Sequence, residues 1–190
     1  MFLLRLRHWQ AFLLLFVLPF LVQYGLLALL DALNVRTGDA VAMLIDALPA
    51  TVYTLWLWQT GLWLRRRLPA SIKPAPLYFH LGTLYLLLYT LLLVYTLALV
   101  RESVVGGTLP LGMLVLLVPL HLLATLCYLY IVYFMARLLV EVEQQRAVDF
   151  GEFAGTYFFF LLLPLGIWFL QPRLRRLYLT EAQANEINTL

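Results

Sequence analysis

Long apolar stretches are the feature of this 190-residue sequence that most restricts its fold. A helix needs about 20 mostly apolar residues to cross the hydrocarbon of a bilayer. Four stretches are long enough, at Trp9–Leu30, Ala40–Leu64, Leu77–Val100 and Leu109–Leu139. Because backbone polar groups find no water inside a bilayer, these stretches are predicted to be helices. The sequence therefore predicts an all-α integral membrane helical bundle with four transmembrane helices, as a single domain over residues 1–190.

Composition supports the membrane and argues against nucleic acid as a partner. Hydrophobic residues make up 64% of the chain and charged residues 12%, whereas soluble domains are about half apolar and one quarter charged. A short soluble chain cannot bury that excess, because its surface is too large for its volume. The basic residues flank apolar runs, which is typical of orientation signals. The expected partners are the lipid bilayer and, as a further possibility, another membrane protein.

The positions of Lys and Arg predict the orientation of the chain. Cytoplasmic loops of membrane proteins carry an excess of these residues. With four spans and a cytoplasmic N-terminus, the cytoplasmic side holds eight of them and the outer side holds two. The eight are Arg5, Arg7, Arg65, Arg66, Arg67, Lys73, Arg137 and Arg146, and the two are Arg36 and Arg101. We therefore expect a bacterial cytoplasmic (inner) membrane protein with its N-terminus in the cytoplasm.

A fifth apolar stretch, Phe153–Leu170, has two predicted arrangements. Its 18 residues are marginal for a span. Pro164 cannot donate to the carbonyl four residues back, and Gly166 lowers helix propensity. The first arrangement is a re-entrant half-helix that breaks at Pro164 and Gly166, with Pro172 as another candidate break. The second is a kinked fifth span, since transmembrane helices tolerate proline.

Charge favours the re-entrant or interfacial arrangement. If the fifth stretch spans, the three arginines after it lie outside, and the count of Lys and Arg becomes 8 inside against 5 outside. If it returns, the count becomes 11 against 2, and the C-terminus is cytoplasmic. The continuation is then an interfacial helix to about residue 179, followed by a polar tail at residues 180–190. Its lipid-facing residues are predicted to be Trp168, Leu170, Leu174 and Leu177.

The segment from Pro164 to Arg173 also carries a resemblance. Its residues read Pro164-Leu-Gly166-Ile-Trp168-Phe-Leu-Gln171-Pro172-Arg173. This string resembles the C-terminal signature Pro-x-Gly-x-Trp-x-x-Gln-Pro-Arg of small polytopic bacterial membrane proteins of unknown function. In those proteins the signature follows a polar stretch similar to Glu143–Phe150. The family pattern often has Asn near the position of Arg175, where this chain departs from it. The resemblance implies a fold and no activity.

Two ionisable residues within the predicted spans are the candidates for chemistry. Charged groups inside a membrane are costly and are functional suspects. Asp46 lies about two turns into the second span, and His121 lies about three turns into the fourth. One hypothesis is that they form a hydrogen-bonded pair that relays protons or holds a polar ligand. The other is that each residue separately satisfies a neighbouring group or faces water.

Other polar side chains have structural explanations. Arg137 and Glu141 are four residues apart, and Glu143 and Arg146 are three apart, so each pair is expected to share a face of a solvated helix end that runs through Gln145. Seven tyrosines of the spans are expected to pack and to anchor the helices at the interface. The alternative is that they line a pigment, quinone or lipid pocket. These tyrosines are Tyr53, Tyr85, Tyr89, Tyr95, Tyr128, Tyr130 and Tyr133.

Motifs of familiar enzymes are missing from the sequence. The only serines, Ser71 and Ser103, lie in predicted loops, and only one aspartate lies well inside a span. There is no HExxH, GxSxG or phosphate-binding glycine loop. Three scattered histidines and the single Cys127 do not make a metal motif. We therefore expect no enzymatic activity, no cofactor and no metal.

The arginine clusters suggest the leading function. We expect a non-enzymatic membrane accessory or scaffold protein whose basic cytoplasmic face contacts lipid headgroups or a partner. The contacting residues are predicted to be Arg65, Arg66, Arg67, Arg173, Arg175 and Arg176. A simpler interpretation is that these arginines only set the topology. The alternative function is a small transporter or channel component that uses Asp46 and His121, with the broken fifth stretch lining the path.

Overall fold

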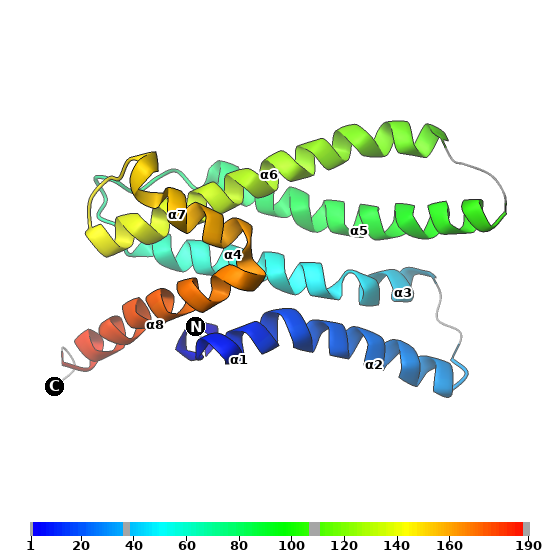
Figure 1. Ribbon diagram of the computed structural model, residues 1–190, viewed down its shortest axis with the longest axis horizontal. Coiled ribbons are helices and arrows are strands. Elements are labelled where there is room, and N and C mark those ends of the chain that lie inside the picture. Colours follow the sequence, from blue (N-terminus) through cyan, green and yellow to red (C-terminus); the bar gives the residue numbers. More distant parts are fainter. Residues whose placement is uncertain (1, 36–38, 107–110, 188–190) are drawn as a thin grey trace. The chain divides into compact units, whose positions relative to one another are not determined.

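The computed structural model describes residues 2–35, 39–106 and 111–187, and every element in these ranges is helical (Figure 1). Three stretches are long and apolar enough to cross a membrane, at His8–Ala32, Leu77–Val100 and Leu111–Gln144. The helices are η1 (Phe2–Arg5), α1 (His8–Phe12), η2 (Leu13–Val17), α2 (Leu18–Ala32), α3 (Asp39–Asp46), α4 (Leu48–Arg66), α5 (Leu77–Val105), α6 (Leu111–Gln144), α7 (Phe150–Leu161) and α8 (Leu163–Ile187). The all-helical fold is thus as predicted, but the count of four spans is not confirmed.

The second predicted span is divided into two helices. α3 ends at Asp46 and α4 begins at Leu48, so Ala47 is a turn between them. Pro49 explains the division, because it has no N–H to donate to the carbonyl of Ile45. A single apolar run in the sequence therefore becomes a short helix and a longer one.

The first and fourth predicted spans keep their helices, with local adjustments. The run from His8 to Ala32 contains a π-helical stretch at Leu13–Val17, immediately before Pro19. A missing proline N–H commonly causes such a bulge. α6 ends at Gln144, one residue before the predicted end, and Gln145 stops it with a φ of 54°.

The C-terminal break lies at Leu162, two residues before Pro164. There the backbone has φ −101° and ψ 46°, which ends α7. Pro164 and Gly166 lie in the first turn of α8, where the missing proline N–H is tolerated. The prediction of a break at Pro172 was wrong, because Pro172 lies inside α8. Gln171 and Arg173, on either side of Pro172, form hydrogen bonds with other segments of unit 1. A helix held by such contacts on both sides of a proline can continue through it.

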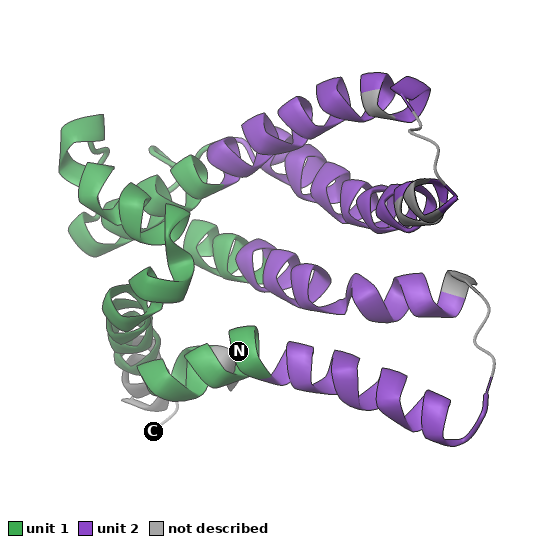
Figure 2. Ribbon diagram, turned by 45° about the vertical axis from the view of Figure 1, so that its right-hand side comes forward, with its two compact units in different colours: residues 1–17, 59–74, 132–190 green, residues 18–58, 75–131 purple. Residues whose placement is uncertain are grey.

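The chain divides into two compact units (Figure 2). Unit 1 contains Met1–Val17, Gln59–Pro74 and Val132–Leu190, and unit 2 contains Leu18–Trp58 and Ala75–Ile131. α4 and α6 each contribute to both units, so this division does not test the prediction of a single domain. The polar tail at 180–190 is helical to Ile187, while residues 188–190 and Arg36 lie outside the described part.

Unit 1 has a tightly packed apolar core. α8 packs against α7, α1 and η1, and one face of α8 is completely buried. That face repeats at helical spacing and consists of Leu163, Ile167, Leu170 and Leu174. The prediction that Leu170 and Leu174 face lipid was therefore wrong, because both pack into this core. Trp168 is 44% exposed, as the prediction required.

Unit 2 consists of long helices with little buried surface. Its two long apolar segments, in α5 and α6, have only 11% and 17% of their most apolar window buried. Thr83, Thr90 and Thr96 return their hydroxyl hydrogens to carbonyls of their own helix, which removes free polar groups from the apolar surface. The remaining surface is mostly hydrophobic and suits a bilayer.

Candidate functional site

Charge is unequally divided between the two units. Unit 1 holds eleven of the thirteen Lys and Arg residues and six of the ten Asp and Glu residues, which leaves it a net charge of +5. Unit 2 holds two basic and four acidic residues, for a net charge of −2. The predicted arginine contacts all belong to unit 1, and the predicted intramembrane pair belongs to unit 2.

Several of the predicted headgroup arginines hold unit 1 together. The Nε of Arg65 donates to the carbonyl of Pro74 at 2.8 Å, which fixes the proline-rich connection after α4. The Arg67 guanidinium lies 3.8 Å from the centre of the Trp63 ring and donates to the carbonyl of Leu177 at 2.9 Å. The hydrogen bond joins the end of α4 to α8, and the cation–π contact holds the guanidinium against α4. Arg65 and Arg67 are thus at least partly structural.

Two further arginines hold α8 in place. Arg173 forms a bidentate ion pair with Glu143, with one Nε–Oε1 distance of 2.8 Å, and donates to the Thr156 hydroxyl at 2.8 Å. Arg175 donates to the carbonyl of Arg5 at 3.2 Å. Glu143 therefore pairs with Arg173 on α8. Glu143 and Arg146, which were predicted to share a helix face, form no ion pair with each other, because Arg146 pairs with Glu152. A bidentate arginine fixes orientation as well as charge.

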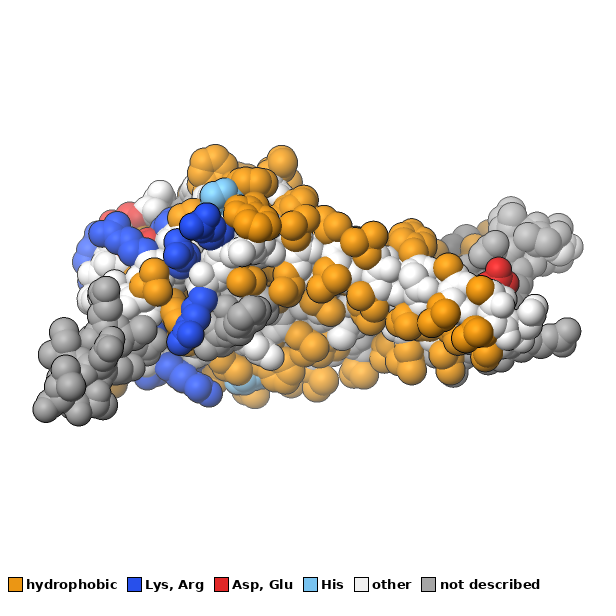
Figure 3. Space-filling view, turned by 90° about the horizontal axis from the view of Figure 1, so that it is seen from below, with side chains coloured by type: hydrophobic (Ala, Val, Ile, Leu, Met, Phe, Trp, Pro, Cys, Tyr) orange, Lys and Arg blue, Asp and Glu red, His pale blue; other side chains and the backbone are white. Residues whose placement is uncertain are grey.

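Three exposed arginines of unit 1 have neither an ion pair nor a hydrogen bond from the guanidinium group within the described ranges. Arg7, Arg66 and Arg176 form no ion pair with any acidic side chain in the described ranges. Exposed Trp9 and Trp168 belong to the same unit. Figure 3 shows Lys and Arg side chains in blue, gathered close to one another beside orange hydrophobic side chains. Arginines among exposed tryptophans are typical of the membrane–water interface.

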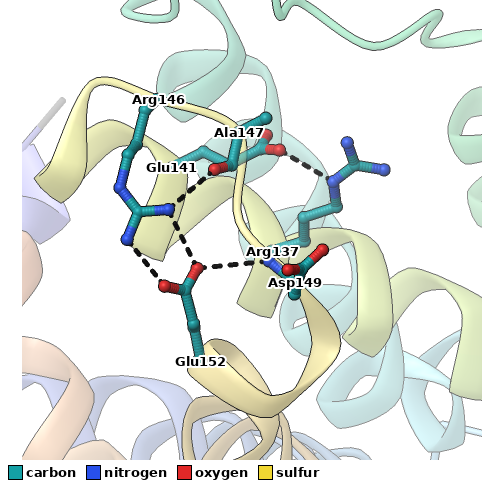
Figure 4. Close-up of polar contacts among 6 residues, drawn as sticks. All are labelled: Arg137, Glu141, Arg146, Ala147, Asp149 and Glu152. Carbon is teal, nitrogen blue, oxygen red and sulfur yellow. Dashed lines mark hydrogen bonds and ion pairs between the residues drawn. The ribbon is translucent and has the colours of Figure 1, made fainter.

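The end of α6 and the start of α7 carry two ion pairs (Figure 4). Arg137 Nε donates to Glu141 Oε1 at 2.8 Å, as the four-residue spacing predicts, and the Glu141 side chain is 0% exposed. Arg146 pairs with Glu152 at 2.6 Å, and the same carboxylate accepts the N–H of Asp149. Glu152 thereby caps the first turn of α7 while it holds the connection from α6.

The Arg146–Glu152 pair predicts a response to acid. The Arg146 guanidinium hydrogen-bonded to Glu152 holds the pKa of that carboxyl below its ordinary value of about 4.3. A lowered native pKa gives stability that is complete above the ordinary value and is lost as pH falls through the lowered value. We expect lower amide protection factors, which are corrected for the intrinsic slowing of exchange in acid, in the first turn of α7 at such pH. Glu152→Gln should show the lower protection factors at neutral pH as well, and an unchanged acid response in that variant would contradict the assignment.

Asp46 and His121 have separate partners in unit 2. Asp46 Oδ1 accepts a hydrogen bond from Gln23 Nε2 at 3.0 Å, and His121 Nδ1 lies 2.6 Å from the Tyr89 hydroxyl. No hydrogen bond joins the two residues in the described part of the chain. The structure thus gives the arrangement in which each polar group is satisfied by a neighbour, and the hypothesis of a direct Asp46–His121 pair is not supported.

His80 and His121 each bond to an aromatic side chain of unit 2. The Trp58 indole donates to His80 Nδ1 at 2.9 Å, so the remaining proton of the neutral imidazole lies on Nε2. That nitrogen then lacks the lone pair that a metal ligand needs. Within residues 2–35, 39–106 and 111–187, no three His, Cys, Asp or Glu side chains are grouped for a metal ion.

Tyrosines line one groove of unit 2. Its volume is about 490 Å³, and Tyr78, Tyr85, Tyr130 and Cys127 contribute to its wall. Tyr85 stacks on Tyr89 with ring centres 6.1 Å apart and donates to the carbonyl of Leu120. Both tyrosines are therefore engaged in joining α5 to α6, which agrees with the predicted packing role.

Gln23 was not among the residues predicted from the sequence to be functional, although its side-chain amide donates the hydrogen bond to Asp46. It is the only amide side chain between Ala11 and Leu30, and an isolated amide within an apolar run was the available signal.

Comparison with protein-family models, with curated proteins and with solved structures found no match. The resemblance of the Pro164–Arg173 segment to small bacterial membrane proteins therefore stays a prediction.

Proposed function

We propose that the protein is a non-enzymatic membrane accessory protein whose unit 1 surface binds anionic lipid headgroups. The observation that carries this proposal is the set of exposed arginines, Arg7, Arg66 and Arg176, which have no acidic partner in the described ranges, in a unit with a net charge of +5. A guanidinium group binds two phosphate oxygens at once, in a bidentate manner. Each basic residue near an anionic surface contributes about 1 kcal/mol to the free energy of binding.

The proposed membrane placement follows from charge and backbone. Four crossings are proposed, the second being formed by α3 and α4 together. α7 and α8 would then form a re-entrant or interfacial element after the turn at Leu162. This arrangement keeps eleven of the thirteen basic residues on the cytoplasmic side of a bacterial inner membrane, with both termini there. Headgroups of that leaflet are the anionic groups nearest the three arginines.

Some arginines of unit 1 are bonded within the protein and others are not, and this difference supports lipid binding over a role in topology alone. An arginine that only sets the topology needs to lie on the cytoplasmic side, and it can use its guanidinium donors for bonds within the protein. Four arginines do so, since they donate hydrogen bonds within unit 1: Arg65, Arg67, Arg173 and Arg175. Arg7, Arg66 and Arg176 keep their guanidinium donors available within the described ranges. Exposed Trp9 and Trp168 are suited to the depth of the headgroups, where phosphate is available.

Lipid selection in nanodiscs tests the proposal. The protein is reconstituted with excess phosphatidylcholine and a minor amount of phosphatidylglycerol, and bound lipid is measured by mass spectrometry after extraction of the washed complex. The wild type should be enriched in phosphatidylglycerol. The triple variant Arg7→Gln/Arg66→Gln/Arg176→Gln should lose roughly 100-fold in apparent affinity, from three contacts of about 1 kcal/mol each.

A matched control removes the same kind of charge elsewhere in unit 1. Arg146 is exposed but paired with Glu152, and an exposed pair contributes little to stability. Arg146→Gln should therefore keep the phosphatidylglycerol enrichment. Equal loss in Arg146→Gln and in each single variant of the other three would show a general charge effect, and no enrichment in the wild type would end the proposal.

A further inference from the structure

The helical hairpin of α7 and α8 has one charged end and one apolar end. The two helices meet at Leu162, and the whole hairpin belongs to unit 1 (Figure 2). Residues 153–172 contain no Asp, Glu, Lys, Arg or His. Glu152 and Arg173, which border this stretch, each form an ion pair within unit 1. We call residues Phe158–Phe169, around the turn, the closed end of the hairpin.

The closed end is apolar on both of its faces. Its inner face is completely buried in unit 1 and includes Phe160, Leu163 and Ile167. Its outer face carries large apolar side chains that are each more than half exposed, namely Phe158, Leu162, Leu165 and Phe169. A helix that is apolar all round belongs in the core of a protein or in a membrane. The outer face of the closed end therefore suits hydrocarbon better than water.

The backbone of the turn has hydrogen-bond partners within the hairpin. The N–H of Leu162 donates to the carbonyl of Phe158 at 2.9 Å, and the carbonyl of Leu162 accepts from Leu165 at 2.9 Å and from Gly166 at 2.8 Å. Pro164 has no N–H that needs a partner. Backbone groups in hydrocarbon must find their partners in the protein, because no water is available there. The turn fits that requirement, which a turn in water does not have to meet.

Close packing keeps the closed end compact. The Phe159 ring stacks on the Phe169 ring, with ring centres 4.7 Å apart and an interplanar angle of 14°. Gly166 lies so near the carbonyl of Phe159 that a Cβ atom there would be 1.8 Å from its oxygen. The two helices are thus fixed against each other, and the closed end would enter a bilayer as one element.

The distance from the turn to the charges matches one leaflet. Glu152 is ten residues before Leu162 and Arg173 is eleven residues after it, which is about 15 Å along each helix axis. Half of the hydrocarbon layer of a bilayer is also about 15 Å. With the charged end at the headgroups, the turn reaches no further than about the middle of the bilayer. A protein partner would not require this spacing, whereas acyl chains below charged headgroups do.

We propose that the closed end of the α7–α8 hairpin binds lipid acyl chains, as a wedge that enters only the leaflet whose headgroups contact unit 1. This inference rests on the proposed placement of unit 1 at the headgroups, and it adds the hydrocarbon of the same leaflet as a second binding partner. The binding of apolar helix faces to one leaflet depends on the curvature and composition of the membrane. The wedge therefore makes unit 1 responsive to how its leaflet is packed.

Depth-dependent fluorescence quenching tests the wedge. Phe158 and Phe150 are a matched pair on α7, because their side chains are 57% and 56% exposed and they lie eight residues, or about 12 Å, apart. Phe158→Cys, Leu165→Cys and Phe150→Cys, each with Cys127→Ala, are labelled with bimane and reconstituted in vesicles of phosphatidylcholine alone. Phosphatidylcholine brominated in the middle of its chains should quench the Phe158→Cys and Leu165→Cys labels several-fold more than aqueous iodide does. The order should be reversed for Phe150→Cys.

The vesicles separate the wedge from the headgroup proposal, because they contain no anionic lipid. Quenching of the closed end by brominated lipid, without enrichment of phosphatidylglycerol in nanodiscs, would end the headgroup proposal and support the wedge. Iodide quenching of the Leu165→Cys label that equals that of Phe150→Cys would overturn the wedge. Quenching by neither reagent, with oxidative cross-linking of Leu165→Cys between two copies, would also overturn it, because a second copy would then cover the closed end.

The side on which Thr180 lies separates a wedge from a fifth span. A wedge places Phe150 and Thr180 on the same side of the membrane, and a span places them on opposite sides. A membrane-impermeant maleimide should therefore label Phe150→Cys and Thr180→Cys from the same side, in cells that are intact or permeabilised. Labelling from opposite sides would mean that the hairpin is open and crosses the bilayer, and the proposal would be wrong.

Discussion

Replacing Gly166 with alanine is expected to lower the free energy of unfolding by about 3 kcal/mol or more, the upper part of the range for overpacking. A Cβ atom at this position would lie 1.8 Å from the carbonyl oxygen of Phe159 and 2.6 Å from its carbonyl carbon. Because these are backbone atoms, no rotamer change relieves the clash, and α8 must move away from α7. Titration of the detergent-solubilised protein with sodium dodecyl sulfate measures the loss.

Gly155 provides the matched control for Gly166. It lies in α7, and a Cβ atom there meets nothing within 4 Å. Gly155→Ala should therefore be neutral or stabilising by roughly 0.5–1 kcal/mol, because alanine is the better helix former. Equal stabilities of the two variants would mean that α7 and α8 do not approach each other as closely as described.

Replacing Arg137 with methionine is expected to cost about 3 kcal/mol, near the lower end of the range for breaking a buried ion pair. Glu141 has a side-chain exposure of 0%, while Arg137 is 35% exposed. Oε1 of Glu141 accepts from Arg137, and its Oε2 has no hydrogen-bond partner. Removal of Arg137 thus leaves a buried carboxylate without compensation. The same detergent titration measures the change.

The double variant Arg137→Met/Glu141→Gln decides whether buried charge is the cause. Neutralising Glu141 removes the uncompensated charge, so the double variant should recover much of the stability lost by Arg137→Met. Arg146→Gln is a useful comparison, because its partner Glu152 is 35% exposed. If the double variant is less stable than Arg137→Met alone, the loss comes from packing of the arginine stem instead.

Local chemistry explains what the sequence could predict. Apolar length predicted the helices, and the break at Leu162 lies close to the predicted one because Pro164 has no N–H for the carbonyl of Phe160 in α7. Arg137 and Glu141 were paired correctly because a helix alone brings residues four apart together. These features depend on residues that are close together in the chain, so they can be predicted from the sequence.

Partners from other helices could not be predicted in the same way. In a membrane protein, apolar side chains face lipid as well as protein, so the pattern of Leu170 and Leu174 fits either environment. Which residue Asp46 meets depends on the rotation of α2 about its axis, and no local rule fixes that rotation. Pro172 stayed helical because contacts on both sides of it hold α8, and these contacts come from Leu6, α6 and α7.

The joining of the two ends of the chain in unit 1 has a consequence for the order of synthesis. Gln171 donates to the carbonyl of Leu6, and Arg5 donates to the Tyr178 hydroxyl, across 165 and 173 residues of sequence. The N-terminal segment therefore leaves the ribosome long before its binding partner exists. Domains ordinarily fold from the N-terminus as they are made, but unit 1 can close only after α8 has been synthesised. A chain without α8 would leave Arg5 and Leu6 without these partners.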